Sequence, residues 1–447
     1  MPVRDLEESR QRVLRVLHSE KPKANGDLSL VVKSILTKKE KLLELAQKYP
    51  TPFFVLDVPA LEESVLNFKG AFQNHFPDCS SYYAVKANHH PFILETVVKH
   101  GFGLDVSSGR ELEMALATNA KKIVFSGPGK TDEELSLALD HAERVTVHMD
   151  SFSELHRLDR LTQKTKRRIR TGVRIFTSVH GEWSKFGISL KDLKRFWLAA
   201  QKCPYLDLQG IQFHLSWNRT PDNYVKVIEQ LGETLEKHFS PKMREQVRFI
   251  DLGGGYFPDR IEAYYPWVDH YAGMSPLGQI LKAADAYFGE KSHFLDPYYV
   301  IESQPLSVFA QAIAAAADRF LRPWVDAEYY TEPGRIIAAT VMHIVVRVVD
   351  KKSPSYVITD GGVNIMGWEY GESFYYPLVN LTHPSLRKEI DCTLYGPLCT
   401  PHDLWGYRCY AQKIAEQDVI VIPNQGAYRY GLAQNFIKSI PEVRFLR

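Results

Sequence analysis

Lys86 lies near the C-terminal end of a short β-rich run, within the sequence YYAVKAN at residues 82–88. In a barrel of alternating strands and helices, such a position puts the side chain at the barrel mouth, where barrel enzymes have their active sites. Removal of the amine from water there would lower its pKa, as a lysine that forms a Schiff base requires. Most lysines that follow a strand merely face solvent, so Lys86 alone is a weak signal.

Three successive glycines, Gly253, Gly254 and Gly255, follow another apolar run. Without Cβ atoms, their N–H groups can approach an anion such as phosphate closely, although a plain glycine turn is the alternative. The run does not match GxGxxG and no Walker lysine follows it, which disfavours a nucleotide ligand.

Residues 331–335, TEPGR, bring a carboxylate and a guanidinium to the end of a further strand. Glu332 could hold a pyridinium nitrogen protonated and Arg335 could grip a phosphate, although a surface ion pair would fit the same spacing. Residues 396–403, GPLCTPHD, present the thiol of Cys399 in a proline-bracketed loop, where a buried structural cysteine is the alternative. The hydroxyl of Tyr428 could also reach a phosphate.

Short β-rich runs alternate with amphipathic helical stretches from residue 51 onward. The predicted strands are 53–56, 81–85, 103–106, 122–125, 145–148, 170–175, 210–214, 247–252 and 329–331. This alternation predicts an α/β fold with a parallel sheet, and the number of units suits a (β/α)8 barrel over residues 51–340.

Beyond Ala339 the helical stretches largely stop. Predicted strands at 341–349, 356–359, 390–395 and 418–422 indicate a separate C-terminal β-domain over residues 341–447. Residues 1–50 are charged and helical in pattern, and we expect them to pack on that β-domain.

The composition excludes several classes of protein. The chain has 447 residues and a formal net charge of +2, which gives no reason to expect a nucleic-acid or membrane partner. Its five cysteines show no CxxC spacing, so neither a metal site nor a disulfide framework is expected. The charged N-terminus has no apolar core of a signal peptide, so we expect a cytoplasmic enzyme.

The order of these motifs resembles the fold-type III pyridoxal-phosphate decarboxylases, the family of ornithine, diaminopimelate and eukaryotic-type arginine decarboxylases. The resemblance runs from about Thr51 to Tyr428 and includes DVSS at 105–108, His180 with KFGI at 185–188, and His214 after Phe213. It implies an alanine racemase-like TIM barrel with a C-terminal β-domain, pyridoxal 5'-phosphate as cofactor, and a head-to-tail homodimer with shared active sites.

The resemblance also implies a role for each matching residue. Lys86 would carry the cofactor as a Schiff base, His214 would stack on its ring and Glu332 would pair with the ring nitrogen. The other cofactor contacts would be Asp105, Arg174, Ser216, Gly253, Gly254, Gly255, Arg335 and Tyr428. Cys399 would enter the neighbouring subunit's pocket as a proton donor, and the substrate contacts would be Thr400, Asp403 and Asp360. A glutamate at the ring nitrogen favours decarboxylation over racemisation, since the barrel racemases have an arginine there.

Three features depart from the best-known members. Thr400 stands where diaminopimelate decarboxylases have glutamate and ornithine decarboxylases have aspartate. The ring-stacking motif reads HLSW in place of HxGS, so Ser216 either substitutes for the usual serine or the phosphate contact is lost. Residues 256–332 are longer than expected and contain an aromatic stretch at 264–267, with Asp259 and Glu262 as acids that could compensate for Thr400.

The CTPxD loop and residues 126–135, SGPGKTDEEL, resemble a biosynthetic subgroup. Its members decarboxylate siderophore precursors such as citryl-diamino acids, or carrier-bound amino acids of antibiotic pathways. We therefore expect an amino-acid decarboxylase of a siderophore or other secondary-metabolite pathway. The alternatives are a diaminopimelate decarboxylase that makes lysine and a catalytically silent regulator of a related decarboxylase, which the presence of both Lys86 and Cys399 disfavours.

Overall fold

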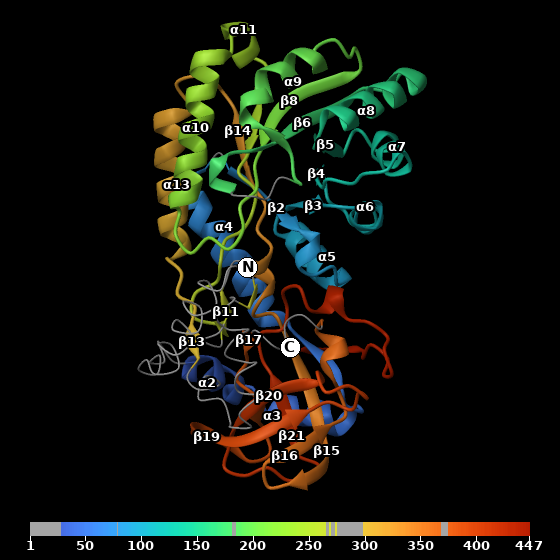
Figure 1. The fold of residues 1–447 in the computed structure, drawn as a ribbon, viewed down its shortest axis with the longest axis vertical. Helices are drawn as coiled ribbons and strands as arrows, with labels where there is room; N and C mark the ends of the chain where they lie inside the picture. Colours follow the sequence, from blue (N-terminus) through green and yellow to red (C-terminus); the bar gives the residue numbers. More distant parts are fainter. Residues whose placement is uncertain are drawn as a thin grey trace, which may run out of the picture.

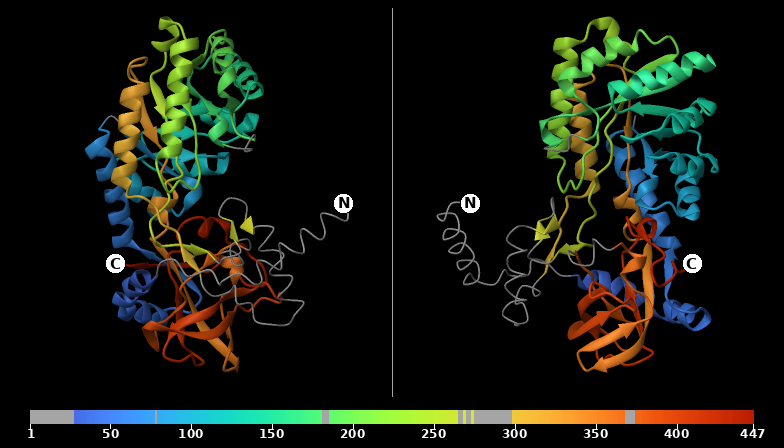
Figure 2. Two further views of the ribbon diagram at one scale, coloured as in Figure 1. Left: turned by 60° about the vertical axis from the view of Figure 1, so that its left-hand side comes forward. Right: turned by 45° about the vertical axis from the view of Figure 1, so that its right-hand side comes forward.

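The computed structural model describes residues 28–77, 79–180, 185–264, 268–269, 273–274, 298–367 and 374–447. They form an elongated molecule with a barrel at one end and a β-domain at the other (Figures 1 and 2). Among these residues, no helix combines the length and the apolar composition that crossing a membrane requires.

The barrel consists of parallel strands in the order β5-β4-β3-β2-β14-β9-β8-β6, closed by the pairing of β5 with β6, and the short β7 (Ile188–Ser189) extends β6. Its strands are β2 (Cys79–Ala84), β3 (Gly103–Val106), β4 (Ile123–Phe125), β5 (Val145–Met149), β6 (Ile169–Phe176), β8 (Leu206–Gln212), β9 (Phe249–Asp251) and β14 (Glu328–Thr331). The predicted (β/α)8 barrel with a C-terminal β-domain is confirmed.

Helices cover the outside of the barrel (Figure 1). They are α4 (Val58–His75), α5 (Pro91–Lys99), α6 (Gly109–Leu116), α7 (Asp132–Asp140), α8 (Phe152–Thr165), α9 (Leu193–Ala200), α10 (Asp222–His238), α11 (Pro241–Arg244), α13 (Leu306–Phe320) and α14 (Arg335–Ala338). Because helices cover one face of the strands and barrel side chains fill the other, strand residues are largely buried, and all five residues of β5 are buried.

Loop 126–131 after β4 is fixed by structural contacts. Lys130 is buried and its ammonium forms an ion pair of 2.7 Å with the buried Glu154. Thr131 caps α7 in a capping box with Glu134. These residues of the SGPGKTDEEL motif therefore stabilise the barrel rim.

A glycine makes room for an aromatic ring inside the barrel. A Cβ atom on Gly210 would lie 1.9 Å from the ring of Phe249, so no larger residue fits there. Phe249 stacks on Tyr330 with ring centres 4.9 Å apart and on His148 with centres 5.7 Å apart. This layer lies beneath the residues at the mouth of the barrel.

The β-domain contains a sheet in the order β16-β19-β20-β18-β21-β15-β1-β22. Its strands are β1 (Phe53–Asp57), β15 (Met342–Ser353), β16 (Tyr356–Thr359), β18 (Val379–Asn380), β19 (Pro384–Tyr395), β20 (Leu404–Ala411), β21 (Val419–Ile422) and β22 (Val443–Leu446).

The prediction that residues 53–56 form a barrel strand is wrong. β1 pairs antiparallel with β15 and parallel with β22, so the chain enters the barrel only with α4. All five residues of β1 are buried, and such a short apolar run fits the interior of either sheet.

Two helices near the N-terminus, α2 (Ser29–Thr37) and α3 (Lys39–Lys48), pack against this sheet. Val32, Ile35 and Leu42 share a buried cluster with Phe53 and Val345. Residues 1–27 of the predicted helical segment lie outside the described residues.

Short strands connect the segment after Tyr256 to the C-terminal part of the chain. β10 (Ala263–Tyr264) pairs with β13 (Tyr299–Val300) and with β17 (Phe374–Tyr375), and β11 (Val268–Asp269) pairs with β12 (Gly273–Met274). Of the predicted aromatic stretch 264–267, only Tyr264 lies within the described residues.

Candidate active site

A cavity of about 400 Å³ opens at the carboxyl ends of the barrel strands. Residues predicted from different parts of the chain meet there: Lys86, Arg174, His214, Ser216, Gly255, Glu332, Arg335 and Tyr428. His180 and Phe186, which belong to the motifs that carried the resemblance, line the same cavity.

Lys86 lies in a single 3-10 turn, η1 (Val85–Ala87), directly after β2. Its Nζ atom is 2.9 Å from Oδ2 of the buried Asp105, whose Oδ1 accepts a hydrogen bond of 2.7 Å from Ser126. Burial alone would lower the pKa of Lys86, but the carboxylates of Asp105 and Glu332 raise it above its usual value. The expected lowering of this pKa is therefore wrong, because two neighbouring anions outweigh the loss of water.

Glu332 follows β14 and points into the base of the cavity. Its Oε1 accepts a hydrogen bond of 3.1 Å from the side-chain amide of Gln212, and its Oε2 is 3.1 Å from Nδ1 of His214. Burial alone would raise the pKa of Glu332, but the contact with His214 and the charge of Lys86 lower it. Glu332 is therefore a carboxylate at neutral pH.

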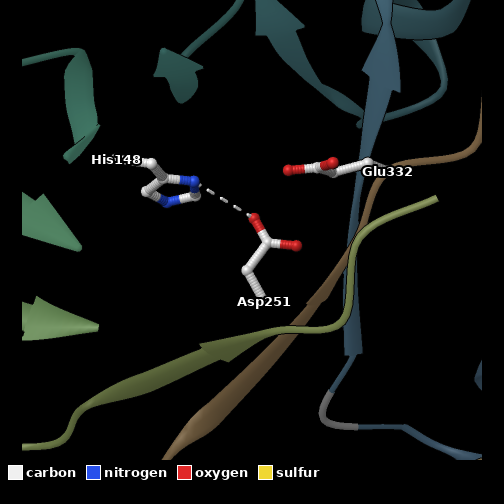
Figure 3. A group of neighbouring side chains, drawn as sticks. All are labelled: His148, Asp251 and Glu332. Carbon is white, nitrogen blue, oxygen red and sulfur yellow. Dashed lines mark ion pairs between the residues drawn. The ribbon is translucent and has the colours of Figure 1, made fainter. Parts of the chain in front are cut away.

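Two further ionisable residues lie beside Glu332 that the sequence analysis did not single out as functional, His148 of β5 and Asp251 of β9. Figure 3 shows the three side chains pointing toward one another, with Nδ1 of His148 3.7 Å from Oδ2 of Asp251. All three are buried. The available signal was an ionisable residue in a mostly apolar strand: the histidine of VTVHM in β5 and the aspartate of FID in β9.

The glycine run packs tightly against the loops around it. A Cβ atom on Gly254 would lie 2.2 Å from the carbonyl oxygen of Glu332. The N–H of Gly253 donates to Oδ1 of Asp251 at 2.9 Å and is therefore occupied within the protein. Gly255 lines the cavity together with Ser216 and Tyr428, so these three residues are placed where a phosphate could be held.

Arg335 is not a free cation. Its Nη1 atom is 2.7 Å from Oε1 of Glu262, and its guanidinium lies 4.6 Å from the ring centre of Trp217 and 5.0 Å from that of Tyr428. Glu262 directly precedes β10 in the segment that the sequence analysis identified as unusually long. The other acid of that segment, Asp259, accepts a hydrogen bond of 2.9 Å from the backbone of Ser303.

Four predicted site residues of the β-domain do not line the cavity of their own chain, whereas a fifth, Tyr428, does. The side chain of Cys399 is exposed, and Thr400 donates its N–H to the carbonyl of Leu398 at 2.8 Å. Asp360 is held by the hydroxyl of Thr51 and by the backbone N–H of Arg347.

Asp403 is only 1% exposed and accepts hydrogen bonds from the N–H groups of Leu398 (2.6 Å) and Val363 (2.8 Å). Both of its oxygens thus stabilise loops of the β-domain. Asp403 therefore has a structural role in its own chain, and its predicted place beside a substrate stays a prediction.

The cavity residues fit pyridoxal phosphate. An amine, a buried carboxylate held as an anion and an imidazole surround one space, and Gly255, Ser216 and Tyr428 lie at its side. These are the groups that such a cofactor needs for its aldehyde, its ring nitrogen, its ring face and its phosphate.

Comparisons with known proteins agree with this fit. The family model described as "Pyridoxal-dependent decarboxylase, pyridoxal binding domain" matches residues 62–291, more than half of the chain. The chain is 26% identical to 2-[(L-alanin-3-ylcarbamoyl)methyl]-2-hydroxybutanedioate decarboxylase of Staphylococcus aureus, over 90% of this chain and 95% of that protein. It is 25% identical to diaminopimelate decarboxylase of Campylobacter jejuni, over 88% of this chain and 90% of that protein.

Solved structures share the fold. Diaminopimelate decarboxylase of Helicobacter pylori in complex with L-lysine superposes with a TM-score of 0.71 at 24% identity, covering 91% of this chain and 94% of that one. Lysine/ornithine decarboxylase of Vibrio vulnificus in complex with putrescine gives 0.70 at 19% identity, covering 92% and 98%. Together with the family match, these findings place the chain among the fold-type III pyridoxal-phosphate-dependent decarboxylases, and it is a carboxy-lyase of that family.

Proposed function

We propose that the substrate is an amino acid with a bulkier or carboxylate-bearing side chain, such as a citryl-diamino acid or a carrier-bound amino acid of a siderophore or other secondary-metabolite pathway. Thr400 carries the proposal, because a neutral hydroxyl cannot form the charged contact that binds a distal ammonium tightly. The loss relative to a carboxylate is about 1–3 kcal/mol. The name of the Staphylococcus aureus relative, whose substrate carries such a tail, supports it.

The charges in the cavity also favour an anionic side chain. Arg174 lines the cavity with its guanidinium 4.5 Å from the ring centre of Phe186. No carboxylate pairs with it among the residues that the structure describes. Arg174 could therefore meet a carboxylate of the substrate as well as support the cofactor.

Three residues of the cavity would have separate roles toward the cofactor. Lys86 would hold the cofactor, the Glu332 anion would keep a proton on the ring nitrogen, and His214 would lie against the ring. When bound, pyridoxal phosphate supplies the electron sink that accepts the bonding electrons as the substrate loses carbon dioxide.

We propose a homodimer in which Cys399 serves the partner's site. Its thiol is exposed and does not line the cavity of its own chain, so a second subunit would bring it to the reacting carbon as the proton donor. The family resemblance supports this arrangement.

Diaminopimelate is the second candidate substrate, and Glu262 is the observation that favours it. This acid lies beside the cavity residue Arg335, and its carboxylate could bind the distal ammonium group of the substrate in place of Thr400.

The test is carbon dioxide release from a citryl-diamino acid, diaminopimelate, ornithine, lysine and arginine, compared as kcat/KM. We expect the citryl-diamino acid to be preferred. Efficient turnover of diaminopimelate with poor turnover of the others would assign the chain to lysine formation.

A further inference from the structure

Glu332, Asp251 and His148 form a closed ionisable cluster beneath the cavity, and His148 and Asp251 have no role in the function described so far. One nitrogen or oxygen atom of each side chain lies within 4.8 Å of such an atom of the other two, and Figure 3 shows the three side chains facing one another. Two carboxylates this close and this deeply buried cannot both be ionised, so one of them must hold a proton.

The hydrogen-bond donors around the two carboxylates decide which one is protonated. Oε1 of Glu332 accepts a hydrogen bond from Gln212, Oε2 lies 3.1 Å from Nδ1 of His214, an atom that also accepts the N–H of Gly254, and Glu332 feels the positive charge of Lys86. Asp251 receives one N–H, from Gly253 on Oδ1. Its Oδ2 is buried and accepts no hydrogen bond from the described parts of the chain, and a side-chain hydrogen bond with Glu332 is among the causes that raise the pKa of Asp251. The proton is therefore retained on Oδ2 of Asp251, while Glu332 stays ionised.

His148 is a neutral member of this cluster. Its ring stacks on Phe249, and neither of its nitrogens has a hydrogen-bond partner among the described residues. Burial lowers the pKa of His148 to about 3, so the imidazole is neutral at physiological pH. Burial and the charge of Glu332 raise the pKa of Asp251 well above its usual range, in agreement with the donor pattern.

We propose that Asp251 is a positioning residue: a neutral carboxylic acid whose Oδ2 proton lies between His148 and Glu332 and makes Glu332 the single anion of this cluster. Asp251 would act through Glu332 and would touch neither cofactor nor substrate. As a hydrogen-bond donor it stabilises the Glu332 anion, which the ring nitrogen of the cofactor requires. The inference holds for any amino-acid substrate.

Infrared spectroscopy of the holoenzyme tests the protonation state without relying on activity. A protonated carboxylic acid has a carbonyl band well separated from the carboxylate bands. The difference spectrum between wild type and Asp251→Asn at neutral pH should show this acid band in the wild type. Asp57→Asn is the matched control, since Asp57 is a buried aspartate whose pKa is lowered to about 2, and its difference spectrum should show carboxylate bands of the wild type and the amide band of the variant, but no acid band.

Kinetics give a second readout. Asp251→Leu removes the hydrogen-bond donor, whereas Asp251→Asn replaces it with an amide N–H. The kcat of the Asn variant should therefore be about tenfold higher than that of the Leu variant. If Asp251→Leu does not fold, the infrared comparison decides alone.

Three results would overturn the proposal. One is a loss of carboxylate bands without an acid band in the Asp251→Asn spectrum. Another is an Asn variant as slow as the Leu variant, which would show that a negative charge is needed at this position. The third is a stoichiometric metal ion in the purified holoenzyme that the Asp251→Asn variant lacks, since a metal ligand would have to be ionised.

Discussion

Glu262 and Arg335 form a nearly buried ion pair of 2.7 Å between the segment after Tyr256 and the turn after Glu332. Their side chains are only 8% and 11% exposed. The positive charge of Arg335 is thus compensated by the protein itself, and Oε2 of Glu262 is buried without a hydrogen-bond partner among the described residues. Glu262 thus occupies Nη1 of Arg335, and a phosphate would bind a guanidinium whose charge is already partly compensated.

Removal of one partner of this pair should destabilise the enzyme more than removal of both. Breaking a buried pair costs about 3 kcal/mol because a charge is left uncompensated, whereas replacing both charges is nearly neutral. We expect Glu262→Gln and Arg335→Gln each to lower the free energy of unfolding, and the double variant to lower it by much less than the sum. Denaturant titration at fixed protein concentration measures this, and additive effects would show that the two side chains do not interact.

Lys86 should be the residue that holds the cofactor. Purified enzyme should absorb visible light, borohydride should abolish this absorbance, and peptide mapping should find the reduced cofactor on Lys86. Lys185→Arg, near the same cavity, is the control and should label normally. Labelling of another lysine in the wild type would refute the assignment.

Glu332→Gln should retain the cofactor but slow decarboxylation. A neutral amide cannot hold the ring nitrogen protonated, and the lost stabilisation of the transition state is ~2–4 kcal/mol, on the order of a hundredfold in kcat. Single-turnover rates at matched cofactor absorbance measure the effect. An unchanged rate would contradict the role of Glu332 as counter-charge.

Two inactive variants should complement each other if the active sites are shared. Lys86→Ala and Cys399→Ala should regain partial activity when mixed, because a mixed dimer has one site with both residues intact. Subunit exchange must be shown in parallel, for example with differently tagged chains. Exchange without recovery would mean that each subunit builds its own site.

Acid should weaken the contact between Lys38, at the end of α2, and Asp57, at the end of β1. Burial alone would raise the pKa of Asp57, but its contacts with His343 and Lys38 lower it to about 2. Since this folded-state pKa lies below the unfolded value, the contribution of about 2 kcal/mol is present above about pH 5 and is lost as the pH falls toward 2. The difference in unfolding free energy between wild type and Asp57→Asn should shrink over this range, and a constant difference would contradict the argument.

The sequence by itself determined the barrel class, the place of Lys86, Glu332 and His214 at strand ends, and the cofactor. The barrel and the strand ends follow from local periodicity, which depends on residues near one another in the chain. The cofactor follows from the resemblance of the short motifs to a known family. The alternation of strands and helices was sufficient to predict the barrel, because each strand–helix unit repeats the same local pattern.

The tertiary structure decided what depends on pairing between distant segments. Residues 53–57 fit either sheet by pattern, and only their partners β15 and β22 assign them to the β-domain. His148 and Asp251 meet Glu332 only because β5, β9 and β14 belong to one closed barrel. Glu262 reaches Arg335 across 73 positions of sequence. The pKa of Lys86 rises because Asp105 and Glu332 lie beside it, and a charge depends on the neighbours that folding brings within a few ångströms.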